Sequence, residues 1–583
     1  MIFRDINSFV KELVRLKQVA FIDAPVDPKL ELAEIHRRVI QEGGPALLFK
    51  NPKGSSFPVV TNLFGTKERA QMAFGKNGEQ FIKDVASLPH ELLPPSIQAL
   101  WGKRSFFGKA LKVGIKNHST HSFVTETPPK LSKLPILTTW PMDGGPFITL
   151  PLVYTEHPET GMHNLGMYRI QRFSDTTTGL HMQIGKGGGF HLSKAKELGK
   201  KLPVNIFVGG PPAAILAAIA PLPENVPELL LASLLLGEKL SLAKNTSGPL
   251  PLLRDAEFCL VGSVTPGEMH PEGPFGDHYG YYSLEHDFPL FRCDALLHKK
   301  DAIYPATVVG KPRQEDFFIG DILQDILSPL FPLVMPAVKS LWSYGETGYH
   351  SLAAAVVQER YKREAMVSGF RILGEGQLSL TKFLLLTDGA LDLTDFRSVL
   401  TYILERADFR SDLYIFSNLS MDTLDYAGPA LNEGSKGILL GMGEKIRDLT
   451  GDFSGDIPYG IRDVKVFSPG CLVVSGHGFE HDRELPQRVA SHKSFSKFPL
   501  IVLCDNAEIA AHTTESFLWT TFTRFEPAAD IYGKEVALKR FHPSLTPPVV
   551  IDARMKPHYP PEVECDDETK ALVDKRWREY FPK

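Results

Sequence analysis

The sequence has few cysteines, no marked excess of charge of either sign and no long apolar run. Its five cysteines, among 583 residues, lie far apart and form no C-x-x-C pair. This spacing argues against a disulfide framework and a structural zinc site, and it favours a reducing cytoplasm. Lys and Arg number 64 against 68 Asp and Glu, a net charge of -4. The chain is therefore not expected to bind nucleic acid, which requires a basic surface.

Neither a signal peptide nor a membrane span is visible in the sequence. The most apolar run, residues 229–237, is far shorter than the ~20 residues that cross a bilayer. The N-terminus places apolar residues at helical spacing, which predicts an amphipathic helix instead of a signal sequence. These apolar residues are Ile6, Phe9, Val10, Leu13 and Leu16. We expect a soluble, cytoplasmic protein.

The length and texture of the chain predict several domains of mixed α/β class. A single hydrophobic core stops growing at roughly 250–300 residues. Residues 1–120 alternate helical patterns with short apolar strands, which indicates an α/β domain. Residues 121–315 contain short strands separated by Gly and Pro, typical of a small β-barrel or antiparallel sheet. Residues 316–375 read as a helical linker, and residues 376–583 as a second α/β domain.

Two segments of the C-terminal part resemble each other. Residues 383–412 and 499–530 each read as an apolar strand, an Asp-bearing turn, a helix and a closing Arg and Asp. Any two strand–helix units look alike, so the pattern alone means little. Identical residues with a slip of one position indicate a local duplication, and these pairs are Asp388 and Asp505, Arg406 and Arg524, and Asp412 and Asp530.

Three clusters in the middle of the chain could carry chemistry. The first has Arg169 on a strand, followed by the Gly-rich stretch GKGGG with Lys186; bare N–H groups there could hold an anion, although a hairpin turn explains the glycines equally well. The second is a Pro-initiated apolar helix followed by Glu228. The third places Glu272 and Asp277 on either side of a Gly-Pro-Phe-Gly turn, where two carboxylates could form an acid/base site or simply face solvent.

Taken together and in this order, the clusters resemble the UbiD family of decarboxylases. The family pattern N-x-G-[IM]-Y-R falls on 164–169, the PPAAIL block with its downstream Glu on 211–228, and EGPFGDHYGYY on 272–282; residues 301–316 match a further block. The resemblance implies an N-terminal α/β domain, a central split β-barrel of FMN-binding type, a linker helix and a C-terminal α/β domain. It also implies prenylated FMN as cofactor, with manganese and a potassium ion, because no side chain is an adequate electron sink for decarboxylation of an aryl acid.

The resemblance also implies roles for individual residues. Arg169, Glu272 and Asp277 would form the catalytic network, in which Asp277 donates a proton and Arg169 holds the substrate carboxylate. Asn164 and Glu228 would bind manganese through hard oxygen donors. The flavin would be contacted by Met167, Tyr168, Arg169, Gln183, Ile184, Gly185, Lys186 and Gly187, and its phosphate by Lys436.

The chain departs from the family at Gly185, where many relatives have a histidine that in some completes the manganese site. The nearest histidines, His181 and His191, are each predicted to be ordinary hydrogen-bonded side chains. We therefore expect manganese to be held by Asn164 and Glu228 together with water or phosphate oxygens, and more weakly than in relatives with the histidine. Lys186 could instead supply positive charge at the phosphate.

The predicted substrate is an aromatic acid, in first place a 4-hydroxy-3-polyprenylbenzoate-like intermediate of quinone biosynthesis. A menaquinone-pathway acid is the runner-up, and a small phenolic acid would undergo the same chemistry. The resemblance further implies a flavin prenyltransferase as cofactor supplier, a homodimer or homohexamer, and peripheral contact with a membrane through a prenylated substrate. Alternatives are a flavin reductase or plain FMN-binding protein, which needs no carboxylate pair, and a catalytically silent relative.

Overall fold

The computed structural model describes residues 2–74, 76–92, 101, 103, 104, 106, 108, 111–182, 187–220, 222, 227–311 and 313–582. Its fold is mixed helix and sheet, as the sequence predicted, and it divides into two units. Unit 1 comprises residues 1–327 and 561–583, and unit 2 comprises residues 328–560. The finer boundaries at 120, 315 and 375 remain predictions.

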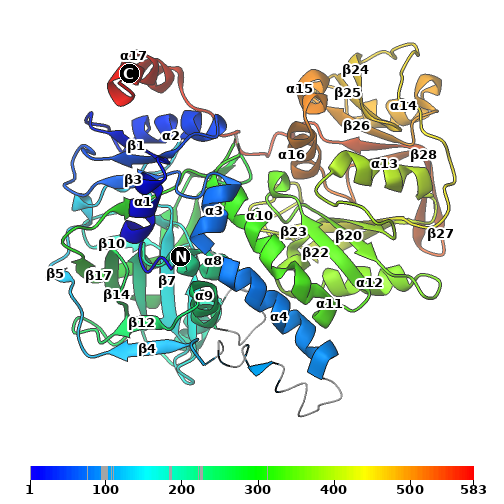
Figure 1. Ribbon diagram of the computed structural model, residues 1–583. Helices are drawn as coiled ribbons and strands as arrows, with labels where there is room; N and C mark the ends of the chain where they lie inside the picture. The colour runs from blue at the N-terminus through cyan, green and yellow to red at the C-terminus, as the bar shows by residue number, and fades with distance from the viewer. Residues whose placement is uncertain are drawn as a thin grey trace. The chain divides into compact units, whose positions relative to one another are not determined.

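Unit 1 begins with a short sheet covered by helices (Figure 1). The sheet has the strand order β1-β2-β3-β18 and contains the parallel pair β1 and β2, joined through α2. Its elements are α1 (Ile6–Arg15), β1 (Val19–Ile22), α2 (Glu31–Gln41), β2 (Ala46–Phe49), β3 (Val59–Thr61), α3 (Lys67–Phe74), α4 (Lys76–Leu92) and β18 (Tyr304–Pro305). Asp5 caps α1 by accepting the N–H of Ser8. The predicted apolar face of α1 is buried apart from Leu16, which ends the helix and is 37% exposed.

The strand-rich middle region forms a seven-stranded antiparallel sheet. The strand order is β10-β17-β14-β11-β7-β8, with β5 paired to β17. These strands are β5 (Val124–Glu126), β7 (Pro151–Glu156), β8 (His163–Gly166), β10 (Thr177–Gly179), β11 (Leu202–Val208), β14 (Phe258–Glu272) and β17 (His286–His298). One core joins this sheet to the N-terminal one, since Ile22 and Val59 pack in the same cluster as Ile206 and Leu260. Closure of the sheet into a split barrel remains a prediction.

Short elements complete unit 1. They are β4 (Ile115–His118), η1 (Leu131–Lys133), β6 (Phe147–Ile148), β9 (Ile170–Gln171), α7 (Gly187–Glu197), α8 (Pro212–Ile219), α9 (Glu228–Leu236), β12 (Leu240–Ala243), β13 (Leu252–Leu253), β15 (Phe275–Gly276), β16 (Tyr282–Ser283), α10 (Glu315–Leu327) and α17 (Asp567–Tyr580). The last helix, α17, lies beside α2 (Figure 1), where Tyr580 and Arg576 both donate to Glu31. Residues 561–583, which the sequence predicts to be part of the C-terminal domain, are attached to unit 1 by these contacts.

Unit 2 contains two five-stranded sheets of identical topology. The first has the order β19-β20-β21-β23-β22 and the second β24-β25-β26-β28-β27. In each, the three central strands are parallel and both edge strands are antiparallel. The strands are β19 (Val338–Ser343), β20 (Leu352–Val357), β21 (Phe383–Thr387), β22 (Leu413–Ser420), β23 (Glu433–Gly441), β24 (Ile461–Ser468), β25 (Cys471–Gly476), β26 (Leu500–Cys504), β27 (Ile531–Lys539) and β28 (His542–Asp552). We call the first sheet with its helices copy A (338–441) and the second copy B (461–552).

Helices separate and cover the two sheets. They are η2 (Ser328–Leu330), α11 (Phe331–Val334), η3 (Gly345–Thr347), α12 (Glu364–Ile372), η4 (Gly376–Leu380), α13 (Phe396–Arg406), α14 (Leu485–Ser491), η5 (Lys493–Phe495), α15 (Ala507–His512) and α16 (Thr514–Arg524). Alternate residues of β21 face opposite sides, so that Leu385 packs with α13 and α16 while Leu384 packs with α12. The core around α13 and α16 contains residues of both copies.

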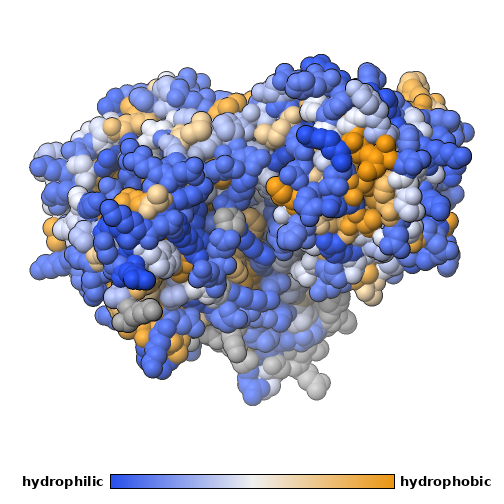
Figure 2. Space-filling view, turned by 90° about the horizontal axis from the view of Figure 1, so that it is seen from above, coloured by the Kyte–Doolittle hydropathy of each residue, from blue (hydrophilic) through white to orange (hydrophobic). Residues whose placement is uncertain are grey.

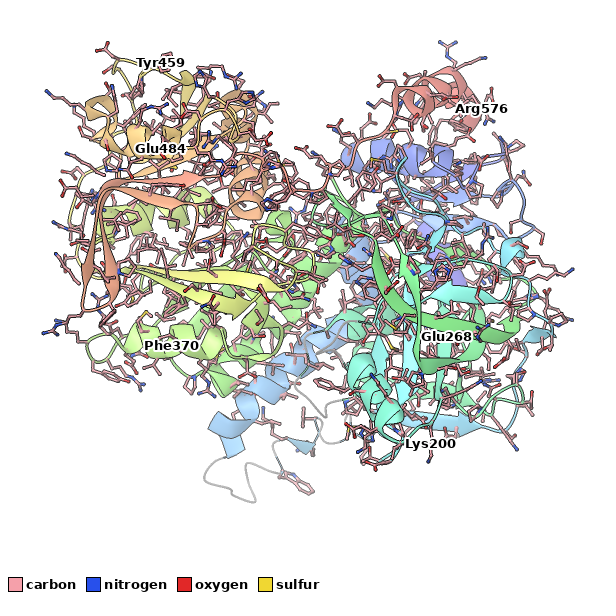
Figure 3. All side chains as sticks on the ribbon, turned by 180° about the vertical axis from the view of Figure 1, so that it is seen from behind. Lys200, Glu268, Phe370, Tyr459, Glu484 and Arg576 are labelled. Atoms are coloured by element: carbon pink, nitrogen blue, oxygen red, sulfur yellow. The ribbon has the colours of Figure 1, made fainter. Side chains whose placement is uncertain are left out.

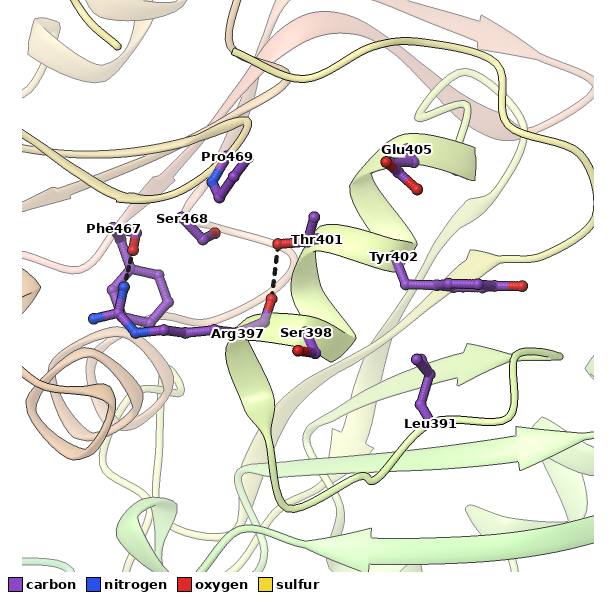
Figure 4. Close-up of a pocket in the computed structure, with 9 residues that line it drawn as sticks. All are labelled: Leu391, Arg397, Ser398, Thr401, Tyr402, Glu405, Phe467, Ser468 and Pro469. Carbon is purple, nitrogen blue, oxygen red and sulfur yellow. Dashed lines mark hydrogen bonds between the residues drawn. The ribbon is translucent and has the colours of Figure 1, made fainter. Parts of the chain in front are cut away.

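Copies A and B are joined by side chains as well as by this shared core. Arg397, in the first turn of α13, lies over the ring of Phe467 at 4.0 Å and donates to the Phe467 carbonyl (Figure 4). Its Nε also donates to Thr514 Oγ1 at 3.3 Å. The open groove beside this joint, about 380 Å³, is lined by α13 and by the turn between β24 and β25. Arg397, the arginine that lines this groove, already makes these contacts with Phe467 and Thr514.

Among the described residues, one helical stretch has the length and composition of a membrane-spanning helix. This is Glu315–Val334, with mean hydropathy 1.5, and 33% of its most apolar window is buried. The stretch consists of α10, the 3-10 turn η2 and the short helix α11. By length and composition alone it is weak support for a membrane span.

Candidate active site

The three residues predicted to be catalytic come together in unit 1. Arg169 lies between β8 and β9, Glu272 is the last residue of β14, and Asp277 directly follows β15. The Arg169 Nε donates to Glu272 Oε1 at 2.9 Å, and its Nη1 donates to Asp277. The third nitrogen donates to Ser283 Oγ at 2.9 Å. One guanidinium therefore fixes both carboxylates, because its planar fork of donors matches their geometry.

Glu272 is fully buried and held from two sides. Besides Arg169, its second oxygen contacts His181 Nδ1 at 2.8 Å. Burial alone would raise the pKa of Glu272, but the charge of Arg169 and the hydrogen bond from His181 hold it below its usual range. Burial and the Arg169 charge together lower the pKa of His181. Glu272 is therefore the ionised member of the pair at neutral pH, and His181 is the neutral one.

Asp277 is also held as a carboxylate. Its Oδ1 accepts from the backbone N–H of His278 at 2.7 Å and contacts the His278 ring at 2.6 Å. Although burial opposes ionisation, these contacts and the charge of Arg169 hold the pKa of Asp277 well below its ordinary value. In the ligand-free protein Asp277 is a proton acceptor, so it must take up a proton before it can donate one.

The two predicted metal ligands also lie close together. Asn164 is on β8, and the N–H of the following residue, Leu165, donates to Glu228 Oε2 at 3.0 Å. Glu228 is the first residue of α9, and burial raises its pKa. Asn164 Nδ2 is buried and has no hydrogen-bond partner among the residues that the structure describes. A carboxylate and an amide so close together each offer an oxygen, the donor atom that a hard divalent cation favours.

Gly187, the last residue of the predicted flavin loop, and the next residue, Gly188, lie directly against this site. A Cβ at Gly187 would come within 1.9 Å of Asn164 Oδ1, so a side chain there would displace the asparagine. A Cβ at Gly188 would meet the Tyr168 hydroxyl at 3.3 Å, and burial raises the pKa of that phenol. Met167 is half-buried in the same segment. Gln183, Ile184, Gly185 and Lys186 lie outside the described residues.

The two histidines near Gly185 have other partners. His181 contacts Glu272, as described above, and His191 Nδ1 contacts Thr155 Oγ1 at 2.9 Å. Burial lowers the pKa of His191 to about 4. In the part of the chain that the structure describes, no group of three or more His, Cys, Asp or Glu side chains is arranged to hold a metal ion. Among the described residues, Asn164 and Glu228 are therefore the two predicted metal ligands that lie close together.

His181 is hydrogen-bonded, as predicted. Two further side chains of the site, His278 and Ser283, were not predicted. His278 directly follows Asp277 in the EGPFGDH motif, so its position was a usable signal. Ser283 lies five residues after His278, and only the antiparallel pairing of β15 with β16 brings it back to Arg169. Its partnership with Arg169 could not be derived from local sequence.

Lys436 belongs to unit 2, on β23 of copy A. It is 4% exposed, and its Nζ donates to the Thr381 carbonyl at 2.9 Å. Burial lowers its pKa to about 8, against the opposing charges of Asp425 and Asp422. Two further acid–base pairs belong to the same cluster. These are Lys382 with Asp425, at 2.8 Å, and His350 with Asp422.

Comparison with known proteins identifies the family. Models of the N-terminal, Rift-related and C-terminal domains of 3-octaprenyl-4-hydroxybenzoate carboxy-lyase match residues 10–88, 113–312 and 317–441. A protein of Chlamydia pneumoniae, named as a subunit of 4-hydroxybenzoate decarboxylase, is 52% identical over 581 residues, covering 99% of each chain. An uncharacterised protein of Archaeoglobus fulgidus is 37% identical over 66% of this chain and 80% of its own. The chain belongs to the UbiD family, whose members are carboxy-lyases.

Solved structures share the fold. The UbiD-class enzyme HmfF of Pelotomaculum thermopropionicum, in complex with FMN, aligns with a TM-score of 0.63 at 22% identity, over 78% of this chain and 98% of its own. Vanillic acid decarboxylase of Sedimentibacter hydroxybenzoicus aligns with a TM-score of 0.67 at 21% identity, over 79% and 97%. The alignments include nearly all residues of the two solved structures, whereas about a fifth of the present chain has no aligned counterpart in them. The family's C-terminal model ends at 441, before copy B begins.

Proposed function

We propose that the protein decarboxylates an aromatic carboxylic acid with prenylated FMN as cofactor. The observation that carries this proposal is the buried network of Arg169, Glu272 and Asp277, in which one guanidinium holds two carboxylates. Hydride transfer between a nicotinamide and a flavin does not require such a pair. When bound, the flavin would supply the electron sink that decarboxylation of an aryl acid needs.

The residues would divide the work as follows. Arg169 would orient the substrate carboxylate, since it is the positive group of the site and already binds two carboxylates. Asp277 would take up a proton and return it to the substrate carbon after carbon dioxide leaves. Glu272, held ionised by Arg169 and His181, would keep the guanidinium in place. Asn164 and Glu228 would hold manganese, and Lys436 the flavin phosphate.

For the substrate we propose a 4-hydroxybenzoate-type acid. The name of the C. pneumoniae relative supports a 4-hydroxybenzoate, and the family description supports an octaprenylated form of it. A place in quinone biosynthesis is part of the proposal. The Sedimentibacter neighbour supports a small phenolic acid instead. A screen of 4-hydroxybenzoate, vanillate and a prenylated analogue for release of carbon dioxide separates these substrates.

Homo-oligomerisation in the cytoplasm is part of the proposal. Figure 2 shows a mostly hydrophilic face with one larger apolar patch over unit 2, and apolar patches mark interaction surfaces. Exposed apolar side chains of unit 2 include Phe370 at 55%, Tyr459 at 85% and Phe541 at 94%. Figure 3 shows Phe370 and Tyr459 at opposite ends of the unit, so they do not form one surface.

The test is to express the protein together with a flavin prenyltransferase and to compare Asp277→Asn and Arg169→Ala with the parent. Both variants should lose decarboxylation by about 10²–10⁴-fold while keeping the fold, because each removes a group that acts on charge developing during the reaction. Asp287→Asn, on an exposed position of β17, is the matched control and should retain activity. Wild-type turnover by Asp277→Asn would show that Asp277 is not the proton donor. Rapid NADPH oxidation without any release of carbon dioxide would favour a flavin reductase.

A further inference from the structure

One loop of copy B lies against the strand of copy A that carries Lys436. This loop, residues 525–530, follows α16. Ser435, the neighbour of Lys436 on β23, donates its hydroxyl to Glu526 Oε1 at 2.9 Å and accepts the backbone N–H of Ala528 at 2.8 Å. Ser435 is fully buried. Both hydrogen-bonding roles of its hydroxyl are thus filled by copy B.

The loop itself is rigidly built. Asp530 accepts the N–H of Glu526 at 2.7 Å, and its own N–H donates to the Glu526 carbonyl at 2.9 Å. The carboxylate of Asp530 is also paired with Lys556 at 3.0 Å, and both side chains are only 5% exposed. A buried, paired carboxylate fixes the turn that presents Glu526. Because the loop is held in one conformation, its hydrogen bonds from Ala528 and to Glu526 hold the Ser435 side chain in one position.

The same turn in copy A reaches copy B through its backbone and not through a carboxylate, since the Phe409 carbonyl accepts the N–H of Leu545, on β28, at 3.4 Å. There, Asp408 and Asp412 occupy the places of Glu526 and Asp530, and Asp412 accepts the N–H of Asp408 at 2.8 Å. The Asp408 carboxylate instead pairs with the exposed Arg410 at 2.9 Å. Glu526 thus stands on a turn that both copies share, but only in copy B does its carboxylate reach another strand.

We propose that the 525–530 loop of copy B is a positioning element for Lys436, holding β23 through Ser435 so that the lysine is set to bind the flavin phosphate. The proposal rests on the phosphate-binding role of Lys436 given above. The loop belongs to the part of the chain beyond the family's C-terminal model, which ends at residue 441. Copy B would then contribute to cofactor retention without touching the cofactor.

The test measures equilibrium binding of FMN to the flavin-free, full-length protein by flavin fluorescence. Glu526→Ala removes the acceptor for Ser435 and should weaken FMN binding by about three- to tenfold, the range for loss of one hydrogen bond. Glu526→Gln retains an acceptor oxygen and should restore most of the affinity. Ser435→Ala breaks the same contact from the other side and should match Glu526→Ala. Glu508→Ala, on the surface of copy B, is the control and should bind FMN as the parent does.

The pH profile separates positioning from mere stability. Affinity for FMN should fall as Lys436 loses its proton, near pH 8 in the parent. Because burial is what lowers that pKa, loosening the strand in Glu526→Ala should move the midpoint upward. A lower melting temperature with unchanged affinity and midpoint in Glu526→Ala and Ser435→Ala would overturn the proposal. If Lys436→Ala itself bound FMN like the parent, the phosphate role would fail instead, so the two failures are distinguishable.

Discussion

Copies A and B of unit 2 share their architecture and differ in their charges. In both copies an Asp directly follows the second of the three parallel strands. Its carboxylate accepts the backbone N–H of a residue that follows the third parallel strand, Gly443 for Asp388 at 2.9 Å and Met555 for Asp505 at 2.8 Å. The three basic residues around Asp422 and Asp425 in copy A, however, correspond to prolines in copy B when the parallel strands of the two sheets are aligned by their pairing register. These counterparts are His350 and Pro469, Lys382 and Pro499, and Lys436 and Pro548.

The prolines of copy B show that the five-stranded sheet forms without the three basic residues. Burying a charge is unfavourable unless it is paired, and apolar substitutes of similar volume are often more stable. Copy B forms the same five-stranded sheet with proline at these three positions, so the sheet does not depend on the bases. Copy A keeps a buried cluster that its own topology does not require. We interpret this cluster as functional, in agreement with the phosphate role proposed for Lys436.

The largest expected effect in this comparison comes from Asp425. Its carboxylate accepts from Ser351 at 3.1 Å and from the Ala427 N–H at 3.0 Å, and it pairs with Lys382. Asp425→Ala would leave a fully buried ammonium without its counter-charge. We expect the free energy of unfolding to fall by about 3–5 kcal/mol, measured by urea denaturation.

Glu508→Ala is the control for this experiment. Glu508 pairs with Lys465 on the surface of copy B, and its removal should leave the urea midpoint unchanged, because exposed ion pairs contribute little. If Asp425→Ala were as stable as Glu508→Ala, the cluster would not be held together by this pair, and the contrast between the copies would lose its energetic basis.

The duplication was visible in the sequence because it preserves local patterns. The strand–turn–helix segments 383–412 and 499–530 occupy equivalent places in the two sheets. The matched acids Asp412 and Asp530 each accept the N–H four residues earlier, at 2.8 and 2.7 Å. Short-range hydrogen bonds of this kind leave a signature in residue type and spacing, so sequence comparison could find them.

Long-range pairing was not predictable in the same way. The return of α17 to α2 depends on Arg576 and Tyr580 reaching Glu31, more than 500 positions away. In the candidate site, the motifs supplied Arg169 and Asp277 but not the ionisation of Asp277, which depends on which donors surround it. Strand and helix patterns describe a segment by itself, whereas a pKa depends on neighbours that only the tertiary structure assembles.

The next effect concerns the pH dependence of stability. Lys436 has a pKa of about 8 in the folded protein, lowered from 10.5. Between these values the unfolded chain binds more protons than the folded one, so stability contributed at this site rises with pH. Lys436→Met does not titrate, as Pro548 does not in copy B. The difference in stability between the parent and Lys436→Met should therefore change in the parent's favour by an amount on the order of 2–3 kcal/mol across this window.

Urea denaturation at intervals from about pH 7 to about pH 10.5 measures this difference. Tyr and other Lys residues titrate in the same range in both proteins, so only the difference between the two curves is informative. Parallel curves for the parent and Lys436→Met would mean that Lys436 keeps its proton throughout and that its burial does not perturb it. Lys436 and its counterpart Pro548 would then differ in side-chain shape but not in their effect on the pH dependence of stability.

The smallest expected effects test the architecture that the two copies share. Asp388→Ala and Asp505→Ala each remove an acceptor for one backbone N–H, from Gly443 and from Met555. Asp388 also accepts from the Tyr402 hydroxyl at 3.0 Å, and Asp505 from Arg524 at 3.1 Å. Neutral hydrogen bonds contribute about 1 kcal/mol and those to charged groups about 1.5–3 kcal/mol. We expect a loss of about 1 kcal/mol for Asp388→Ala, because Asp388 is exposed, and about 2 kcal/mol for Asp505→Ala, because Asp505 pairs with the nearly buried Arg524.

Asparagine at the same positions decides whether the turn is built alike in both copies. The amide oxygen of Asp388→Asn and Asp505→Asn can still accept the backbone N–H, so each should recover stability relative to its alanine variant. The recovery should be nearly complete in copy A. In copy B it should be partial, since an amide oxygen is a weaker partner for Arg524 than a carboxylate. Recovery in one copy and none in the other would mean that the matched aspartates have different structural roles, and the resemblance between the copies would then extend to strand order but not to the turns that connect the strands.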